Sequence, residues 1–390
     1  MLLGFKTEIK VKSHQRILLA KHAGVARHAW NWGLDLTKKI LDNNQENPEA
    51  KIKVPTAIDL HKWLVALVKS ENSWYYEVSK CAPQYALRHL RKAWDDCFKK
   101  KKKPPHFKKK GKQDSFTLDG SITVEDYQIK VPRIGWLKTY ERLPQGIKPS
   151  SVTISKKAHR WFISFKIEIE PSKMAPQNNP IGIDLGLLRF ATLSTGEELC
   201  SPRPYKQLEQ KLAQLQWKNR NKVIGSNNCQ KAQLKIAKLH YKISCIRQDF
   251  IHKLTSRLAK NHSEIVIENL NVAGMIKNRK LSKAIADSGF FEFKRQLAYK
   301  TQLYGSELVL ADRFFPSSKL CPCCGHKKEQ LPLSMRVYDC ENCDWIADRD
   351  YSASLNLLGL VRPDVMPVET KTPKSVDEAG TEVDSIGICG

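Results

Sequence analysis

Four cysteines in the last quarter of the chain have the spacing of a zinc site. Cys321 and Cys324 form one Cys-x-x-Cys pair, and Cys340 and Cys343 form a second. Zinc prefers four thiolates in a tetrahedron, and each such turn supplies two of them from one short loop. Cys323 is an alternative ligand inside the first pair, although the Cys-x-x-Cys-Gly spacing favours its neighbours. We therefore predict a structural zinc ribbon. A disulfide framework is the weaker interpretation, because the remaining cysteines are scattered.

Three carboxylates at the ends of predicted elements are candidate ligands for Mg²⁺. Asp184 follows three strand residues and precedes a tight turn, Glu268 ends the apolar run 265–267, and Asp350 starts the last predicted helix. Phosphodiester cleavage by two metal ions needs carboxylates from separate segments, and Mg²⁺ takes oxygen ligands while keeping several waters. Each acid also has an ordinary structural explanation as a turn or helix-cap residue. Asp348 is an alternative to Asp350 if the helix begins earlier, and the residues alone leave that choice open.

The charge of the chain indicates a polyanionic partner. The 390 residues include 66 Lys and Arg against 40 Asp and Glu, a formal net charge of +26. Basic residues lie along the whole chain beside nine Trp rather than on one amphipathic helix, which favours nucleic acid over a membrane surface. A basic protein without a specific partner is the remaining alternative. No apolar run approaches the roughly 18 residues that span a bilayer, so we expect a cytoplasmic protein with reduced thiols.

The first part of the chain predicts one strand followed by helices. Residues 3–11 read as a strand, and from about residue 15 apolar residues recur at steps of three and four through residue 41. Residues 58–68 and 85–98 are the clearest further helices, and the second has a basic face. Nine lysines then lie between residues 99 and 112, around two prolines that cannot continue a helix. This run is either a solvated connector or a clamp on phosphates. The candidate nucleic-acid-binding residues are Arg88, Arg91, Lys99, Lys100, Lys101, Lys102, Lys103, Lys108, Lys109 and Lys110.

The rest of the chain predicts a β-rich part and then an α/β part. Residues 115–170 contain short alternating runs typical of antiparallel strands, and they suggest a small β-barrel. After a polar linker at 171–180, residues 181–186 begin an α/β pattern with a hairpin partner at 189–193. A helix over 231–260, about 45 Å long, has one apolar face and one basic face. Further elements are strands at 264–268 and 307–311, a helix at 290–304 and a last helix at 352–360. Beyond residue 363 the chain lacks apolar periodicity and is predicted to be a disordered acidic tail.

The motifs together resemble a known family. Gly182-Ile-Asp-Leu-Gly186, Ile267-Glu-Asn-Leu270, the two cysteine pairs and the segment 348–356, Asp-Arg-Asp-Tyr-Ser-Ala-Ser-Leu-Asn, occur in that order. They are similar to the RuvC-type nuclease domain of the TnpB proteins, which are RNA-guided endonucleases encoded by insertion sequences and related to type V CRISPR effectors. The likeness extends to Trp30-Asn31, 84–90, 107–111 and 295–300 and covers about residues 1–360. Three positions depart from the family pattern: Ser352 stands for the usual Asn, Ser354 for the usual Ala, and Asp344 for the usual Gly.

This resemblance implies a multi-domain α/β architecture with an RNase H-like RuvC domain. It also implies that Asp184, Glu268 and Asp350 hold two catalytic Mg²⁺ ions, while the four cysteines hold one structural Zn²⁺. The implied domains are a wedge-like β-barrel at 1–14 and 106–175, an inserted helical recognition domain at 15–105, the RuvC domain at 178–316 and 347–362, the zinc ribbon at 317–346 and the tail at 363–390.

The function implied is that of an RNA-guided, Mg²⁺-dependent DNA endonuclease of a mobile element. A guide RNA from the element's end would pair with double-stranded target DNA beside a short adjacent motif, and hydrolysis would leave a 3′-hydroxyl and a 5′-phosphate. No obligate protein partner and no membrane are expected, and the protein would act in a prokaryotic cytoplasm at the nucleoid. The alternatives are a transposase acting directly on element ends and a guide-dependent DNA-binding repressor that has lost cleavage.

Overall fold

The computed structural model describes residues 1–112, 114–172, 176, 179–332 and 334–363. The chain divides into two compact units, Met1–Ile169 and a second unit from Glu170 onward. The disordered tail predicted at 363–390 lies, apart from its first residue, outside the described residues, as does part of the linker predicted at 171–180. Each unit is described by itself below.

The first unit combines an antiparallel sheet with a group of helices. Its seven strands pair in the order β2-β6-β7-β1-β5-β4-β3, and β1 runs antiparallel to β7 over eight residue pairs. The predicted antiparallel strands are therefore confirmed. Among the described residues no pairing joins β2 to β3, so the pairings give an open strand order and not the closed barrel that was expected. The strands are β1 (Leu2–Lys10), β2 (Ser115–Asp119), β3 (Thr123–Glu125), β4 (Gln128–Val131), β5 (Gly135–Thr139), β6 (Ser151–Lys157) and β7 (Arg160–Glu168).

The helices of this unit lie between β1 and β2 in sequence. The long helix predicted after the first strand is α1 (Ser13–Glu46), and α3 (Cys81–Phe98) matches the second predicted helix. The helix predicted at 58–68 is shorter: α2 (Ala57–Trp63) continues as a π-helical turn, Leu64–Lys69, followed by a 3-10 turn, Ser73–Glu77. Buried leucines such as Leu34, Leu87 and Leu90 join these helices and the sheet in one hydrophobic core.

The second unit is built on a five-stranded mixed sheet, in the order β10-β9-β8-β11-β12. Strands β8 (Ile181–Leu185), β11 (Glu264–Ile267) and β12 (Glu307–Leu310) run parallel. Strands β9 (Ala191–Leu193) and β10 (Glu198–Leu199) extend the sheet as antiparallel neighbours of β8. The central strands are almost entirely apolar and buried, as expected for parallel strands covered on both faces. The α/β, multi-domain class predicted from the sequence is confirmed.

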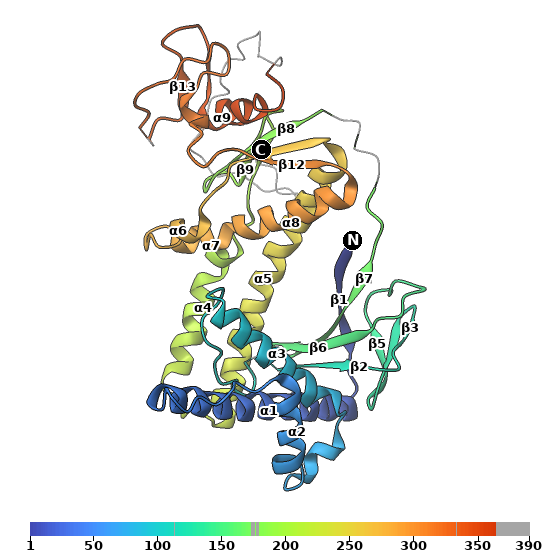
Figure 1. Cartoon of the computed structure of the whole chain (residues 1–390). Helices are drawn as coiled ribbons and strands as arrows, with labels where there is room; N and C mark the ends of the chain where they lie inside the picture. The colour runs from blue at the N-terminus through green and yellow to red at the C-terminus, as the bar shows by residue number, and fades with distance from the viewer. Residues whose placement is uncertain (113, 173–175, 177–178, 333, 364–390) are drawn as a thin grey trace. The chain divides into compact units, whose positions relative to one another are not determined.

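Helices connect and cover the sheet of the second unit (Figure 1). Between β10 and β11 the chain forms a hairpin of two long helices, α4 (Pro204–Arg220) and α5 (Asn227–Asn261). Short helices α6 (Val272–Met275) and α7 (Ser282–Ser288) lead to α8 (Phe290–Tyr304), which packs against α5. Phe190 in the sheet region meets Phe250, Phe290 and Phe293 at ring-centroid distances of 5.2–5.7 Å, so aromatic contacts hold this face together.

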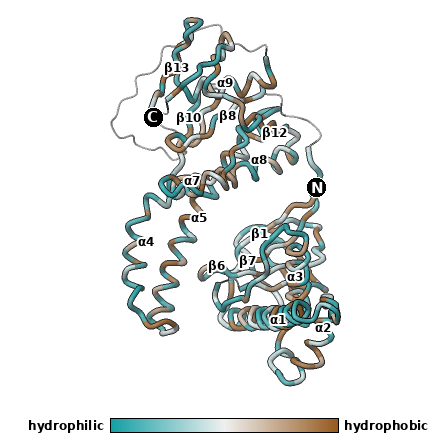
Figure 2. Tube along the Cα trace, turned by 60° about the vertical axis from the view of Figure 1, so that its left-hand side comes forward, coloured by the Kyte–Doolittle hydropathy of each residue, from teal (hydrophilic) through white to brown (hydrophobic). Residues whose placement is uncertain are grey.

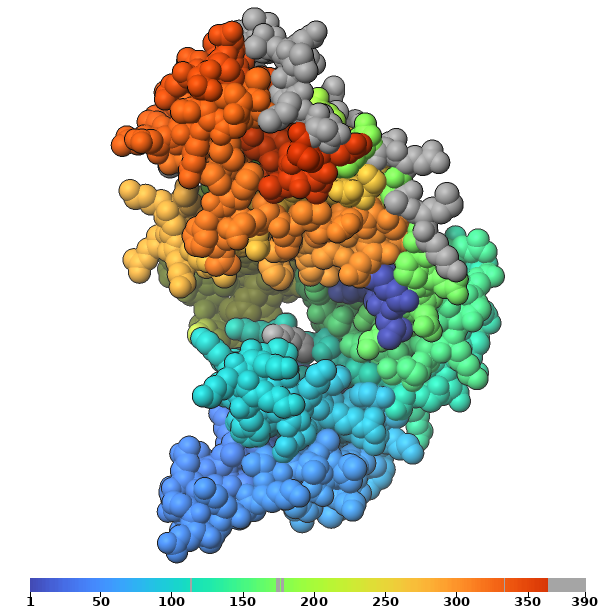
Figure 3. Space-filling view, turned by 45° about the horizontal axis from the view of Figure 1, so that its top comes forward, coloured from blue at the N-terminus to red at the C-terminus, as the bar shows by residue number. Residues whose placement is uncertain are grey.

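The cysteine-containing segment follows β12. It begins with a 3-10 turn, Ser317–Lys319, contains the two-stranded hairpin β13 (Val337–Asp339) and β14 (Ile346–Asp348), and passes directly into α9 (Arg349–Leu358). Figure 3 shows the orange cysteine-containing segment lying directly against the red residues of α9. Over the described part of the chain, no helix has the length and apolar character needed to cross a membrane.

Candidate active site and metal centre

Two neighbouring parallel strands place Asp184 and Glu268 at the same end of the sheet. Ile183 and Ile267 are paired across β8 and β11, and each acid is the next residue along its chain. Because parallel strands end on the same edge, the two carboxylates emerge side by side. The pairing of β8 with β11 thus brings together two motifs that lie far apart in the sequence, the one around Asp184 and the one around Glu268.

Helix α9 brings Asp350 to these two acids because Gly182 allows a very close approach. A Cβ added at Gly182 would lie 2.1 Å from the carbonyl oxygen of Ser354 and 2.6 Å from the backbone nitrogen of Leu358. Any side chain at this position of β8 would therefore push α9 away from the strand. The first glycine of the Gly182-Ile-Asp-Leu-Gly186 motif thus sets the distance between the strand and the helix that hold two of the three acids.

The three carboxylates act on one another electrostatically. Burial raises the pKa of Asp184 well above its usual value, and the negative charges of Glu268 and Asp350 raise it further, while Arg349 opposes them. Burial and the charge of Asp350 also raise the pKa of Glu268, against a hydrogen bond from Ser317 that lowers it. Carboxylates that repel one another while partly shielded from water form a site that a cation would stabilise.

Asp348 and Asp350 have different surroundings, which bears on the choice that the sequence left open. One carboxylate oxygen of Asp348 accepts hydrogen bonds from the backbone N–H groups of Asp350 and Tyr351, at 2.8 and 3.1 Å, and so caps α9. Its other oxygen accepts from Arg189 Nη1 at 2.8 Å, and Arg189 Nε also pairs with Glu198 at 2.8 Å. Asp348 is thus engaged as a helix cap. Asp350, in the first turn of α9, is the acid that interacts with both Asp184 and Glu268.

The four predicted zinc ligands converge on one point. Their sulfur atoms all lie within 4.8 Å of one another, with Cys321 Sγ and Cys343 Sγ 3.6 Å apart and Cys324 Sγ and Cys340 Sγ also 3.6 Å apart. Hydrogen bonds from the Asn342 side chain and the His326 backbone lower the pKa of Cys324 to about 6, which favours the thiolate that zinc requires. This arrangement fits a structural zinc ion.

Cys323 is exposed and lies outside this group of four sulfur atoms. Among the described residues, the four cysteines are the single group of three or more possible metal ligands gathered so closely. The three carboxylates are near enough for the charges of Glu268 and Asp350 to raise the pKa of Asp184, but they are not gathered as closely as the four sulfur atoms.

Hydrogen bonds tie the cysteine-containing segment to α9 and to Glu268. Asn356 Nδ2 donates to the carbonyl oxygens of Ser317 and Leu320, at 2.7 and 2.8 Å. Ser317 Oγ in turn donates to Glu268 Oε1 at 2.6 Å, and Trp345 Nε1 donates to Ser352 Oγ at 3.1 Å. Ser352, which stands where the resemblance leads us to expect Asn, is therefore buried and accepts a hydrogen bond from Trp345.

Sequence reasoning missed the supporting residues Arg189, Ser317, Trp345 and Asn356. The chain separates Arg189 from Asp348 by 159 positions, and Ser317 from Glu268 by 49. No local spacing links such partners. Arg349 and Asn356 were visible as members of the segment 348–356, but not as supports of the site. Arg349 Nε lies 3.6 Å from Asp350 Oδ1.

Several of the candidate nucleic-acid-binding residues have partners inside the first unit. Arg91 donates to the carbonyl oxygens of Val54 and Pro55 and pairs with Asp95 at 2.9 Å. Lys102 pairs with Asp96 at 2.8 Å, and Arg88 lies 5.0 Å from the ring centroid of Tyr85. The candidates that remain exposed with no contact of this kind described are Lys99, Lys100, Lys101, Lys103, Lys109 and Lys110.

The predicted connector at 99–112 is not free along its length. Trp30 Nε1 donates to the carbonyl oxygen of His106 at 3.0 Å, and Asn31 exchanges hydrogen bonds with the backbone of Lys108 at 2.7 and 3.0 Å. Lys108 Nζ lies 3.9 Å from the ring centroid of Trp30, and burial lowers its pKa. Of the two alternatives for this run, a connector solvated along its whole length does not describe residues 106–108, because α1 holds them in place.

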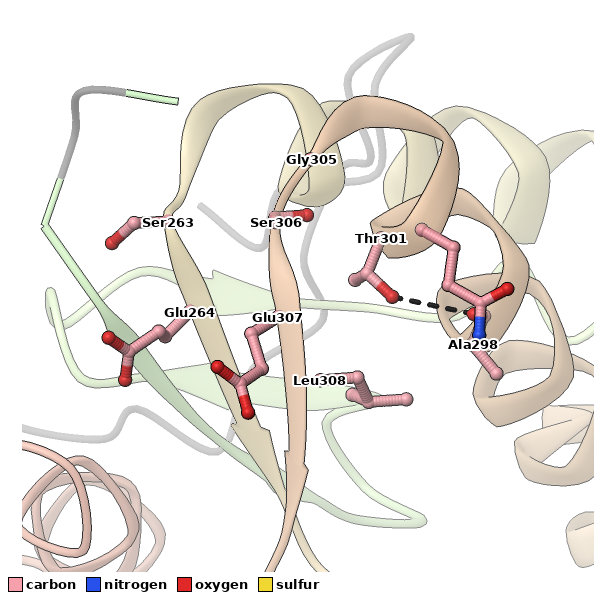
Figure 4. Close-up of a pocket in the computed structure, with 9 residues that line it drawn as sticks. Ser263, Glu264, Ala298, Thr301, Gly305, Ser306, Glu307 and Leu308 are labelled. Carbon is pink, nitrogen blue, oxygen red and sulfur yellow. Dashed lines mark hydrogen bonds between the residues drawn. The ribbon is translucent and has the colours of Figure 1, made fainter. Parts of the chain in front are cut away.

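A surface pocket of about 660 Å³ lies at the opposite end of the same sheet (Figure 4). Glu264 and Glu307, paired on β11 and β12, point the same way at its edge, and Ser263 and Ser306 precede them. Glu264 and Glu307 are the first residues of β11 and β12, whereas Glu268 follows the last residue of β11. The pocket is therefore separate from the carboxylate cluster and does not contribute to it.

Three family models match parts of the chain. One described as "Probable transposase" matches residues 164–279, one described as "Cas12f1-like, TNB domain" matches 290–357, and one described as "Helix-turn-helix domain" matches 1–46. The first covers Asp184 and Glu268, and the second covers all four cysteines and Asp350. Over residues 1–46 the structure has a strand and one continuous helix rather than two helices joined by a turn.

Two bacterial proteins are similar over most of their length, and both are named "Putative RNA-guided DNA endonuclease", the second with the addition InsQ. The protein from Streptomyces pristinaespiralis is 37% identical over 91% of this chain and 88% of its own. The protein from Escherichia coli K12 is 32% identical over 92% of each chain. A solved structure titled "Cryo-EM structure of the Cas12f1-sgRNA-target DNA complex" aligns with 92% of this chain and 98% of its own at 15% identity and a TM-score of 0.34, too low to support an inference.

Proposed function

This chain belongs to the TnpB family, and from that premise we propose that it is an RNA-guided DNA endonuclease of a mobile element. The observation that supports the proposal most is the carboxylate cluster. Asp184, Glu268 and Asp350 come from three separate segments, act on one another, and stand where the family's nuclease motifs have their acids. Both similar bacterial proteins carry names that describe this activity.

The three acids would hold two Mg²⁺ ions in a RuvC-type site. Carboxylate oxygens are the ligands that Mg²⁺ prefers, and burial together with the charges of neighbouring acids raises the pKa of Asp184 and of Glu268, which a bound cation would offset. Bound Mg²⁺ would supply Lewis-acid chemistry, which makes water a stronger nucleophile and neutralises charge on a phosphate. The donor set therefore fits the ions that the family implies.

The chain's own residues fix the positions of these acids. Asp348, held by Arg189, caps α9 and so orients the first turn that carries Asp350. Ser317 holds one oxygen of Glu268, and this leaves the second oxygen of that carboxylate for a metal ion. Such supporting hydrogen bonds commonly set the affinity of a metal site.

The four cysteines would hold a structural Zn²⁺ that braces α9. The segment they organise contacts α9 through Trp345 and Asn356 and reaches Glu268 through Ser317. We propose that zinc stabilises this segment and thereby the carboxylate site, without taking part in catalysis.

The nucleic-acid partners would be a guide RNA from the element's end and a double-stranded DNA target. Base pairing would read the target sequence, and the protein would read a short adjacent motif and the backbone shape of the heteroduplex. The first unit, with its open antiparallel sheet and a helical recognition part, would bind the duplex and the RNA scaffold. Its exposed lysines 99–101, 103, 109 and 110 remain candidate phosphate contacts.

Sequencing of the nucleic acid that co-purifies with the protein tests the proposal. The protein is expressed beside its native flanking DNA, and the bound RNA is extracted and sequenced. One dominant RNA with a constant scaffold and an end beyond the element boundary is expected. That RNA and a matching target are then incubated with the protein in Mg²⁺, where cleavage supports the proposal and an intact target in the presence of bound RNA supports the repressor instead.

A transposase acting directly on element ends is the second candidate, because the model described as "Probable transposase" covers residues 164–279. Such an enzyme would also use carboxylates and Mg²⁺. It would bind and join element ends without RNA. Strand transfer by RNA-free protein would therefore replace the first proposal with the second.

A further inference from the structure

The helical hairpin of the second unit has an outer part in which α4 packs against α5. We call residues 211–247 of this hairpin the α4–α5 arm; α4 and α5 lie side by side along it (Figures 1 and 2). A small apolar cluster of Leu212, Leu239 and Ile243 holds the two helices together. All members of that cluster belong to α4 and α5, so the apolar faces of the two helices cover one another.

The arm has an unusual charge. Between residues 210 and 248 the chain has nine Lys and Arg and no Asp or Glu. Arg247, at the base, is the one member of this group for which an ion pair is described, with Asp287. Free cations concentrated in this way fit a polyanion rather than a protein surface of mixed charge.

Four of these cations form a line. Lys231, Lys235, Lys238 and Lys242 follow one another at steps of four, three and four residues, which places them on one face of α5. All four are exposed, and the line is about 16 Å long at 1.5 Å per residue. Charges about 5–6 Å apart along a helix suit the successive phosphates of one nucleic-acid strand.

The tip of the arm adds exposed apolar side chains to these cations. Trp217, Val223 and Ile224 are exposed by 61%, 77% and 90%, and the guanidinium of Arg220 lies 4.8 Å from the ring centroid of Trp217. Figure 2 shows the hydrophobic colour of the turn that joins the two helices. An exposed tryptophan beside an arginine can stack on an unpaired base, whereas paired bases inside a duplex are not accessible to it.

We propose that the α4–α5 arm is a binding surface for RNA, in which the line of lysines contacts the phosphates and Trp217 stacks on an unpaired base. RNA suits both halves of the surface, because a folded RNA has phosphates along its helices and unstacked bases in its loops. The inference rests on the proposed function, since that function supplies a bound RNA. It goes further by assigning RNA contacts to this arm and to these side chains.

The test compares binding of the co-purified RNA by the wild-type protein and by two variants. The first variant carries Lys231→Gln, Lys235→Gln, Lys238→Gln and Lys242→Gln, and the second carries arginine at the same four positions. We expect the glutamine variant to bind RNA at least about tenfold more weakly, with the slope of log Kd against log salt reduced by about three. The arginine variant keeps the charges and should bind within about twofold of wild type. Equal thermal unfolding midpoints would show that the variants are folded.

Trp217→Ala tests the tip separately. Loss of one stacked base should weaken RNA binding by about tenfold and leave the salt slope unchanged, because no charge is removed. Ultraviolet cross-linking followed by mass spectrometry should also join Trp217 to a base in the wild-type complex.

Each contrary result has a distinct meaning. RNA affinity and salt slope like those of wild type in the glutamine variant would overturn the arm proposal and leave the proposed function standing. Unchanged RNA binding with weakened target-DNA binding would replace RNA by DNA as the occupant. A wild-type protein that binds no RNA would remove the proposed function itself, and the arm proposal with it.

Discussion

The cysteine cluster and the carboxylate cluster both lie against α9, but they are assembled in different ways. The cysteines come from one segment of 23 residues, 321–343, in which two short turns supply all four sulfur atoms. The carboxylates come from β8, from the residue after β11 and from the first turn of α9. One site is local, and the other exists only when the sheet and the helix have folded together.

The two clusters also differ in their electrostatics. In the carboxylate cluster, burial and the negative charges of neighbouring acids raise the pKa of Asp184 and of Glu268. The ionised carboxylates therefore lower the free energy of unfolding, whereas bound zinc would raise it by stabilising the segment that supports them. We propose from this contrast that one centre is structural and the other catalytic, and four experiments can test it.

The largest effect is expected from Asp184→Asn. The amide keeps the size of the side chain but removes a negative oxygen ligand, so cleavage should fall by about a thousandfold or more. RNA binding and target binding should remain within about twofold of wild type. The measurement is single-turnover cleavage of a guide-matched target in Mg²⁺. Cleavage at the wild-type rate would remove Asp184 from the active site.

Cys340→Ser tests the other cluster. With three thiolates left, the site should lose zinc, and the midpoint of thermal unfolding should fall by about 5–10 °C. Metal content by mass spectrometry and calorimetry measure both effects. The matched control is Cys323→Ser, which changes an exposed cysteine outside the cluster and should keep one zinc per chain. Full zinc content and full cleavage in Cys340→Ser would contradict the bracing role.

Arg189→Met tests the connection between the sheet and α9. The substitution leaves the Asp348 cap without its cationic partner, so the Mg²⁺ concentration for half-maximal cleavage should rise by about 10–100-fold. Hydrogen exchange should quicken at the backbone amides of Asp350 and Tyr351, which donate to Asp348. Exchange does not depend on activity, so it reports on the cap itself.

Arg257→Met is the control for this experiment. Arg257 Nη1 pairs with Glu197 at 2.8 Å in the same unit, as Arg189 Nη1 pairs with Asp348, but this pair does not involve α9. Equal effects of the two substitutions on Mg²⁺ dependence and exchange would show a general loss of stability. Only a selective effect of Arg189→Met supports a positioning role.

The contrast between the clusters also explains what the sequence could predict. The cysteines were recognised from spacing alone, because each pair acts within one turn. Asp184, Glu268 and Asp350 looked ordinary one by one and became a site only through the family resemblance. Asp348 could not be separated from Asp350 in the sequence, because the partner that engages it, Arg189, lies 159 residues away.

The same distinction holds for the fold. Long periodic helices such as α1 and α5 and the apolar strands β8 and β11 were predicted, because a single segment carries their pattern. The π-helical turn after α2 and the strand order of the first sheet were not, because they depend on contacts between segments. The lysine-rich connector illustrates this, since Trp30 and Asn31 on α1 hold residues that composition alone assigns to solvent.

The smallest expected effect is the pH dependence of stability in zinc-loaded protein without Mg²⁺. Folding raises the pKa of Asp184 and of Glu268, so the folded state binds protons more tightly than the unfolded state. Stability from these groups is therefore lost as the pH rises from the ordinary carboxylate range through the raised pKa values, by at most about 1.4 kcal/mol per pH unit for each. Asp184→Asn removes the larger contribution, so its stability relative to wild type should grow with pH over that window and then level off. Denaturant unfolding at a series of pH values measures the difference, and added Mg²⁺ should reduce it by stabilising the wild-type protein. A difference that does not change with pH would mean that the carboxylates do not repel one another, and the contrast with the cysteine cluster would then be lost.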